Sequence, residues 1–292
     1  MFCYHFVAEE DVMKKIWISG ANGHVGQALK TILEPENYEL LLTDKEEVDI
    51  TVQEDVHQYM KLMRPDVLIN CSGLTNLEEC IENEDEAYHV NAIGARNLAA
   101  EAHNMNCKMI QLSTDDVFDC KEEQPINEFV IPSPTSVYGK SKYAGERFIT
   151  SLNEHYVIIR SSWVYGTGHD YVDDVLTAVQ KNTPIEASVN EFASPTSALE
   201  LAKTIIFFID HDYFGIYHCV CKGSCSRYEF AKEILRNINS DLEVIPNHSK
   251  QAHRSHYSVL DNMMLRLDGI GQPCDWKEAL QHYLTHGGQT ID

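Results

Sequence analysis

The chain has 292 residues, of which 45 are acidic and 23 basic, so its formal net charge is -22 at pH 7. A charge this negative argues against nucleic acid and against anionic membrane surfaces as partners, because both would repel the protein. The length suits one large unit or two closely joined lobes, and the 43% of hydrophobic residues supplies a sizeable core.

The nine cysteines lack the paired spacings of a secreted disulfide scaffold, which predicts reduced thiols in a cytoplasmic protein. No apolar run reaches the roughly 18 residues that a membrane-spanning helix needs. Residues 1–12 lack the basic start and long apolar stretch of a signal peptide. We interpret them as an upstream leader or a tail, and Met13 as the start of the domain.

Apolar runs alternate with helical patterns through the first half of the chain, which predicts an α/β fold with a doubly wound parallel sheet of the Rossmann type. The predicted strands cover residues 15–19, 39–43, 67–71, 108–112 and 156–160. The predicted helices cover residues 24–33, 53–63, 84–104 and 136–153. In such sheets ligands bind beyond the carboxyl ends of the strands, so the site residues are expected there.

After Gly166 the alternation loosens, which predicts a smaller substrate-binding lobe. Its predicted helices cover residues 171–181, 198–210, 226–237 and 276–283. We therefore expect a nucleotide-binding Rossmann domain over residues 13–165. Residues 166–292 should form mainly the substrate-binding lobe, with some segments returning to the Rossmann domain.

A glycine-rich turn follows the first predicted strand and leads into the first predicted helix. Gly20 supplies the tight turn, Gly23 lets the backbone approach a pyrophosphate, and Gly26 allows close packing of the helix. The amides of the helix N-terminus then face the phosphates of a dinucleotide. With acidic Asp44 at the end of the second strand, the pattern is typical of a dinucleotide-binding site. The predicted cofactor-binding residues are Gly20, Asn22, Gly23, His24, Val25, Gly26, Asp44, Asp49, Ile50, Cys71, Ser72, Gly73, Tyr138 and Lys142.

Tyr138 and Lys142 are four positions apart on a predicted helix and so share one face. The Lys142 ammonium is expected to favour the ionised phenol and to lower the Tyr138 pKa from about 10, as a general acid or base requires. Among 14 tyrosines, chance alone supplies roughly one such pair, and we interpret the second, Tyr228 with Lys232, as structural. Tyr138 differs because it follows both the glycine turn and Thr114, which ends an apolar strand.

Together these residues resemble the extended short-chain dehydrogenase/reductase superfamily, and within it the dTDP-4-dehydrorhamnose reductase family. The resemblance extends from Met13 to about Leu284. Its specific elements are Ser113-Thr114-Asp115 with Val117-Phe118-Asp119, Tyr138 to Lys142, Arg160 to Gly166, and Pro195-Thr196 after Asn190-Glu191-Phe192. Asn91 matches the superfamily's structural asparagine, which ties backbone rather than contacting substrate.

The resemblance implies a reaction in which a reduced nicotinamide passes hydride to the 4-keto group of a deoxy-sugar nucleotide. Tyr138 would protonate the resulting oxyanion, Thr114 would orient that oxygen by a hydrogen bond, and Lys142 would hold the nicotinamide ribose. These three are the predicted catalytic residues. By the same analogy Trp163 would pack on the sugar. The predicted substrate-binding residues are Thr114, Asp115, Asp116, Trp163 and Arg254.

The sequence departs from the family pattern at three places. Family members usually carry tyrosine where this chain has Asp116, which leaves the identity of the sugar and nucleotide open without touching the proton-transfer residues. Residues 71–75 read Cys-Ser-Gly-Leu-Thr in place of the more usual Ala-Ala-Ala-His-Thr, so the groove near the cofactor is altered. Some family dimers hold magnesium through a glutamate at the position of Ala28, so we predict no metal here.

Cofactor preference depends on two neighbouring residues. Asp44 suits the ribose hydroxyls of NAD(H), whereas Lys45 could accept the extra phosphate of NADP(H). The resemblance favours NADP(H), with NAD(H) tolerated. It also implies a nucleotide-sugar substrate and leaves room for a homodimer.

Residues 246–258 contain no acid, which stands out in so acidic a chain. The segment carries His248, Lys250, His253, Arg254 and His256. We interpret it as a candidate diphosphate-binding loop, with a plain solvated loop as the alternative.

Cys219, Cys221 and Cys225 lie beside His218 and raise the question of a zinc site. Their spacing is not a Cys-x-x-Cys pair and no second pair follows. We therefore favour a strand near residues 216–220, along which Cys219 and Cys221 alternate.

The leading hypothesis is an NADPH-dependent reductase that makes dTDP-L-rhamnose for cell-surface polysaccharide. Asp116 favours, as an alternative, a related nucleotide-sugar 4-ketoreductase or epimerase with a different sugar or nucleotide. A third hypothesis is a non-catalytic, cofactor-binding regulatory subunit that resembles the methionine adenosyltransferase beta subunits. The presence of Thr114, Tyr138 and Lys142 argues against the third, because a purely regulatory protein has no need of them.

Overall fold

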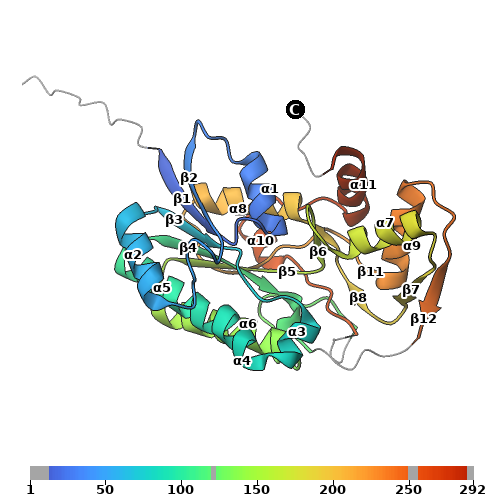
Figure 1. Ribbon diagram of the computed structural model, residues 1–292, viewed down its shortest axis with the longest axis horizontal. Helices are drawn as coiled ribbons and strands as arrows, with labels where there is room; N and C mark the ends of the chain where they lie inside the picture. Colours follow the sequence, from blue (N-terminus) through green and yellow to red (C-terminus); the bar gives the residue numbers. More distant parts are fainter. Residues whose placement is uncertain (1–12, 120–122, 249–255, 288–292) are drawn as a thin grey trace, which may run out of the picture.

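A computed structural model describes residues 13–119, 123–248 and 256–287, and shows a parallel six-stranded sheet with helices on both faces (Figure 1). The predicted α/β fold of the Rossmann type is thereby confirmed. The predicted leader at residues 1–12 and the predicted substrate residue Arg254 lie outside the described residues.

The main sheet has the strand order β10-β5-β4-β3-β1-β2, and every neighbouring pair is parallel. Its strands are β1 (Lys14–Ser19), β2 (Tyr38–Thr43), β3 (Val67–Asn70), β4 (Lys108–Thr114), β5 (Tyr156–Ser161) and β10 (Gly215–His218). The chain runs from β1 outward to β2 and then crosses back to β3 on the other side of β1. The strand order therefore reverses between β1 and β3, which is where open α/β sheets bind their ligands.

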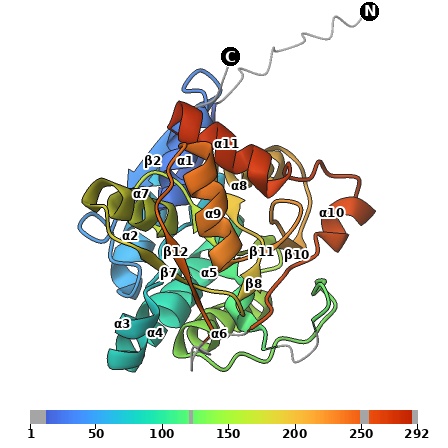
Figure 2. The ribbon, with the colours of Figure 1, turned by 90° about the vertical axis from the view of Figure 1, so that its right-hand side faces the viewer.

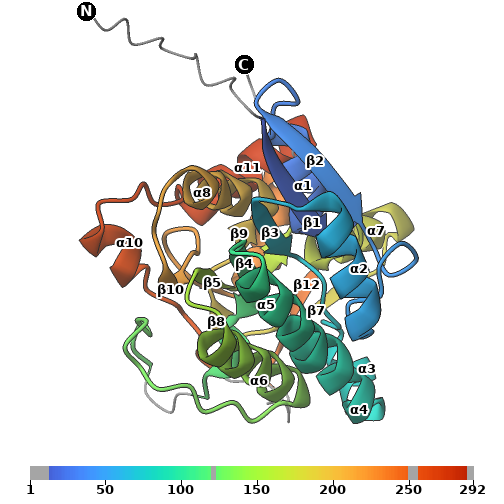
Figure 3. The same ribbon diagram turned by 90° about the vertical axis from the view of Figure 1, so that its left-hand side faces the viewer.

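Side chains alternate between the two faces of each strand, and this alternation sets the layers. One face is covered by α1 (His24–Ile32) and α8 (Ala198–Asp210), and the other by α2 (Gln53–Met63), α5 (Ala95–Asn104) and α6 (Val137–Leu152), as Figure 3 shows. Ile16 and Ile18 belong to the core under α1 and α8, whereas Trp17 between them belongs to the core under α2 and α5. Both faces of the sheet are thus buried from solvent.

The segment predicted as one helix over residues 84–104 is divided. Its parts are α4 (Glu84–Tyr88), a π-helical segment (His89–Gly94) and α5. A further short helix, α3 (Leu77–Glu82), precedes them. Asn91, in the π-helical segment, accepts a hydrogen bond from Leu74 N and donates to Leu74 O and Ser141 Oγ, each at 2.9 Å. A π-helical turn accommodates an extra residue, and here it ties the helix to the backbone beyond β3.

The smaller lobe contains elements that the sequence did not predict, mostly very short strands (Figure 2). Its strand pairs are β7 (Ile185–Ser188) with β12 (Val244–Asn247), β8 (Phe192–Ala193) with β11 (Cys225–Ser226), and β6 (Val164–Tyr165) with β9 (Thr196–Ser197). Its helices are α7 (Tyr171–Lys181), α9 (Arg227–Asn237) and α11 (Trp276–His286). Phe230 and Trp276 centre its aromatic core. α8, β10 and α10 (Met263–Leu267) lie with the main sheet although they follow residue 166.

Cys219, Cys221 and Cys225 are all buried, and Cys219 N donates to Arg160 O just beyond β10. Within the described ranges, no group of three or more His, Cys, Asp and Glu side chains is arranged to hold a metal ion. No helix in these same ranges combines the length and the apolar character that crossing a membrane requires.

Candidate active site

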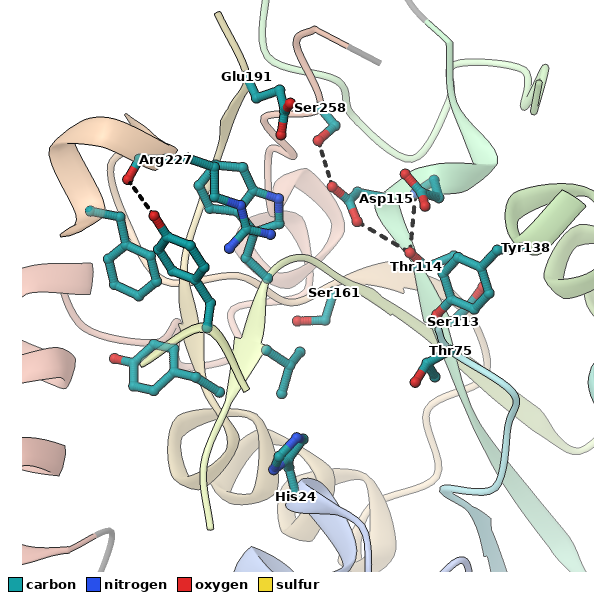
Figure 4. Close-up of a pocket in the computed structure, with 16 residues that line it drawn as sticks. His24, Thr75, Ser113, Thr114, Asp115, Tyr138, Ser161, Glu191, Arg227 and Ser258 are labelled. Atoms are coloured by element: carbon teal, nitrogen blue, oxygen red, sulfur yellow. Dashed lines mark hydrogen bonds between the residues drawn. The ribbon is translucent and has the colours of Figure 1, made fainter. Parts of the chain in front are cut away.

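Three adjoining cavities open beyond the carboxyl ends of the central strands. The Thr114 pocket is lined by Thr114, Asp115, Asp116, Tyr138, Trp163, Arg227 and their neighbours (Figure 4). The glycine-turn cavity shares Tyr138 and His24 with it and adds Lys142, while the Asp44 cavity continues past residues 71–73. All the predicted cofactor-binding residues line the last two cavities except Gly26, which packs against the backbone of Gly20.

The glycine turn fits a dinucleotide. Gly20 has φ +76°, and a Cβ there would stand 2.6 Å from Ser72 N, so only glycine leaves the turn this close to the segment after β3. Gly23 is the N-cap of α1, and no side chain caps the helix there. The first amides of α1 therefore face the cavity without a protein acceptor from the cap, as phosphate binding requires.

The charged residues that line the Asp44 cavity are mainly acidic. Asp44 Oδ2 accepts a hydrogen bond from Asn22 N at 3.0 Å, which fixes the carboxylate against the glycine turn. Lys45 is the one lysine or arginine among the described residues that line the cavity, and its Nζ lies 3.5 Å from Glu86 Oε1. Asp49 accepts from the Thr51 hydroxyl at 2.7 Å. The cavity thus offers acceptors for ribose hydroxyls and a single cation for a phosphate.

Thr114 ends β4, and its hydroxyl joins a buried network. Oγ1 accepts from Asp116 N at 3.1 Å and donates to Asp115 Oδ1 at 3.2 Å. Asp115 Oδ2 also accepts from Ser162 at 2.8 Å and from Ser258 at 2.5 Å. Asp115, predicted to bind substrate, lines the pocket, yet these hydroxyls already engage its carboxylate.

Lys142 lies one turn after Tyr138 on α6, but the two side chains have different partners. Lys142 Nζ donates to Leu112 O at 2.8 Å, at the end of β4. Burial lowers the pKa of Lys142 to about 8, with Glu146 acting in the opposite direction. The lysine therefore keeps its proton at neutral pH and presents an ammonium group to the glycine-turn cavity.

The prediction that Lys142 lowers the Tyr138 pKa is wrong for this structure. The pKa of Tyr138 is raised well above 10, chiefly because its surroundings desolvate the phenol, and next because the Asp116 carboxylate is near. A hydrogen bond with Thr114 acts the other way but does not prevail. Tyr138 is therefore a neutral phenol at neutral pH, which is the form that an acid needs in order to donate a proton.

Gly139 holds α6 against the loop after β4. A Cβ at this position would overlap the backbone carbonyl oxygen of Asp116, so at Gly139 the helix and the loop touch through main chain. Ser136, the N-cap of α6, accepts from Gly139 N at 2.9 Å. Tyr138 thus stands on a helix turn fixed at both its cap and its contact with the loop.

Asp116→Asn is expected to lower the Tyr138 pKa toward 10, because the neutral amide removes the largest charge effect on the phenol. An acid is active only while protonated, so its rate falls as the pH rises through its pKa. The alkaline decline of kcat should then begin at lower pH in Asp116→Asn than in the wild type. Superimposable profiles of kcat from neutral to strongly alkaline pH would contradict this electrostatic role for Asp116.

The opposite wall of the Thr114 pocket is aromatic and carries one cation. Arg227, the first residue of α9, has its guanidinium carbon 3.6 Å from the centroid of the Trp163 ring and 4.6 Å from that of Tyr171. Trp163 has a φ of +43°, rare for a large residue, and such strain concentrates at functional sites. One face of Trp163 is therefore covered by Arg227, which leaves less of the ring for the sugar contact predicted by analogy.

The sequence did not single out Arg227 or Glu191 as site residues. Glu191 belongs to the Asn190-Glu191-Phe192 element of the family resemblance, which implies no role for it, and Arg227 directly precedes Tyr228. Lys232 Nζ lies over the Tyr228 ring at 5.3 Å, outside the Thr114 pocket. The only sequence signal for Arg227 is that it lies at the start of a predicted helix. Its contact with Trp163 cannot be predicted, because the two residues are far apart in sequence.

A buried ion pair joins the strand and the helix that flank the site. Arg160 on β5 donates to both carboxylate oxygens of Glu146 on α6, at 2.9 and 2.7 Å. Ser113, next to Thr114, donates to the same carboxylate at 2.6 Å. Both charged side chains are only 2% exposed, so the pair locks α6 to β4 and β5.

Residues 13–288, which include every part of this site, match the family model of the RmlD substrate binding domain. The chain belongs to this family. Its predicted resemblance to dTDP-4-dehydrorhamnose reductases is confirmed by the relatives that follow.

Three known proteins illustrate how closely others resemble this chain. Spore coat polysaccharide biosynthesis protein SpsK of Bacillus subtilis (strain 168) is 32% identical over 285 residues, which cover 96% of this chain and 100% of SpsK. A dTDP-4-dehydrorhamnose reductase structure from Clostridium acetobutylicum has a TM-score of 0.90 and 38% identity, covering 93% of this chain and 98% of its own. The Bacillus anthracis dTDP-4-dehydrorhamnose reductase in complex with NADP has a TM-score of 0.92 and 35% identity, covering 94% and 99%.

Proposed function

We propose that the protein is an oxidoreductase that reduces the 4-keto group of dTDP-4-dehydrorhamnose to dTDP-L-rhamnose, with NADPH as hydride source and NADH tolerated. The observation that carries the proposal is that the Thr114 pocket and the glycine-turn cavity meet at Tyr138. A ketone in the first and a nicotinamide in the second would share this phenol as proton donor. The product would serve cell-surface polysaccharide synthesis.

The residues of the chain have distinct tasks in this reaction, while the bound nicotinamide supplies the hydride. Tyr138 holds a proton at neutral pH and delivers it to the substrate oxygen as negative charge develops there. Thr114 donates its hydroxyl proton to Asp115 Oδ1 in this structure and would turn it to the same substrate oxygen when the ketone binds. Lys142 offers its ammonium to the ribose hydroxyls in the glycine-turn cavity.

The reductase proposal is tested by following the oxidation of NADPH and NADH with dTDP-4-dehydrorhamnose and with UDP- and GDP-linked 4-keto sugars. Turnover with the dTDP sugar is the expected result. Turnover only with a UDP or GDP sugar would favour the related 4-ketoreductase or epimerase. No turnover with any ketone would exclude the reductase function and favour a regulatory subunit.

The alternative of a different sugar or nucleotide is supported by Asp116. Its side chain lines the Thr114 pocket as an acid where the family usually presents an aromatic ring. An acid favours hydroxyl or amine groups on the sugar rather than stacking. A cytoplasmic location and a homodimer stay predictions.

Lys45→Met is expected to weaken NADPH binding by roughly 5- to 10-fold while leaving NADH binding unchanged, because only NADPH carries the phosphate that Lys45 would meet. Glu86→Gln should act in the opposite direction, since it removes the acid that now faces Lys45 at 3.5 Å. Dissociation constants from cofactor fluorescence would measure both. Lys61→Met, an exposed lysine on α2, is the control. Equal losses for both cofactors would contradict a phosphate contact.

A further inference from the structure

Arg227 is the single lysine or arginine among the described residues that line the Thr114 pocket, where it faces three acids: Asp115, Asp116 and Glu191. A nucleotide-sugar carries two negative charges on its diphosphate. In a chain with a net charge of -22, such a substrate is repelled unless a local cation meets it. The pocket therefore needs a cation, and Arg227 supplies one.

The geometry of Arg227 suits an anion that approaches in the plane of the guanidinium. Its flat face stacks on Trp163 and lies near Tyr171, whereas the N–H donors of a guanidinium lie in its plane, away from the stacked face. Its backbone is also held, because Arg227 N donates to Glu191 O at 3.3 Å and Arg227 O accepts from Tyr171 at 3.1 Å. The planar fork is thus oriented before any ligand binds, and it matches phosphate oxygens.

Glu191 gives an independent sign that a ligand completes this wall. The residue is only 4% exposed, and its Oε1 has no hydrogen-bond partner within the described parts of the chain. A buried carboxylate oxygen without a donor is costly, and most such groups in proteins are paired. Because Glu191 lines the Thr114 pocket, a ligand hydroxyl there would supply the missing donor.

The positions of the ketone and the diphosphate on the sugar ring match the two opposite walls of the Thr114 pocket. On a pyranose ring the 4-keto carbon and the anomeric carbon, which carries the diphosphate, are opposite each other. Thr114 and Tyr138 stand on one wall and Arg227 and Glu191 on the other, as Figure 4 shows. A sugar whose ketone meets Tyr138 therefore directs its diphosphate toward Arg227.

We propose that Arg227 binds the diphosphate of the nucleotide-sugar substrate and that Glu191 accepts a hydrogen bond from a hydroxyl of the same ligand. This assignment rests on the proposed function, which it deepens by naming the group that recognises the nucleotide. It differs from the sequence-based expectation, which gave the diphosphate to the segment that contains Arg254.

The test is isothermal titration of dTDP and of thymidine into the full-length protein and its variants. Arg227→Gln is expected to weaken dTDP binding by roughly 10- to 100-fold, the range for a hydrogen bond to a charged group, and to leave thymidine binding unchanged. Arg236→Gln removes an exposed arginine from the same helix α9, where it pairs with Glu233, and should change neither. Unchanged NADPH binding shows that each variant is folded.

Several outcomes overturn the assignment. If Arg227→Gln binds dTDP like the wild type, or loses thymidine as strongly as dTDP, the arginine does not bind the diphosphate. If Arg254→Gln alone weakens dTDP binding, the diphosphate belongs to the other segment. Because binding is measured without turnover, an Arg227-dependent dTDP site in a protein that reduces no ketone would refute only the proposed function.

Discussion

Tyr138→Phe is expected to reduce kcat by about 10²-fold or more, because the variant keeps the ring but loses the proton that general acid catalysis delivers. NADPH binding should persist, since the contacts that we propose for the cofactor, at the glycine turn and Lys142, do not depend on the phenol hydroxyl. Steady-state rates with the keto sugar and fluorescence titration of NADPH measure the two effects separately.

Tyr228→Phe is the matched control for this variant. Tyr228 also stands four residues before a lysine on a helix, yet it lies outside the Thr114 pocket. It should retain wild-type turnover, which would show that the surroundings and not the spacing make Tyr138 the acid. Full activity in Tyr138→Phe would remove Tyr138 from its catalytic role.

Glu146→Gln is expected to lower the free energy of unfolding by about 3–5 kcal/mol, because it leaves the Arg160 charge buried without its counterion. The pair is almost fully enclosed, and Ser113 loses a charged acceptor as well. Denaturant unfolding followed by circular dichroism measures the loss. A Glu146→Leu, Arg160→Met double variant should recover much of it, because neither charge then remains buried.

Glu233→Gln provides the comparison at a pair whose arginine is exposed. Arg236, its partner at 3.4 Å, is 77% exposed, and such pairs contribute only about 0–1 kcal/mol. A loss in Glu146→Gln no greater than in Glu233→Gln would show that Arg160 is solvated or paired otherwise once Glu146 is neutral.

The sequence predicted those features that local patterns determine. Thr114 and Asp44 were expected at strand ends because apolar runs stop before them, and the parallel sheet brings those ends to one edge. Gly20 was expected at a tight turn, and its φ of +76° agrees. Each of these inferences needs only the residue and its immediate neighbours.

What the sequence could not predict depends on contacts between distant segments. The Tyr138 pKa moves upward because folding desolvates the phenol and brings Asp116 near, whereas the spacing to Lys142 suggested a downward shift. The contact of Arg227 with Trp163 joins α9 to the loop after β5, which no periodicity relates. The π-helical segment around Asn91 is likewise stabilised by tertiary hydrogen bonds to Leu74.

The main-chain contact at Gly139 separates two properties of residue 116. Its carbonyl oxygen sets how near the loop comes to the helix that carries Tyr138, and every amino acid has that oxygen. Its side chain faces the pocket instead and varies with the residue. Family members with tyrosine there, as the sequence resemblance implies, and this chain with aspartate can therefore differ in the substrate that they accept without any change in the position of Tyr138. A substitution at this one position can change which substrates are accepted while the spacing between the loop after β4 and the helix that carries Tyr138 stays the same.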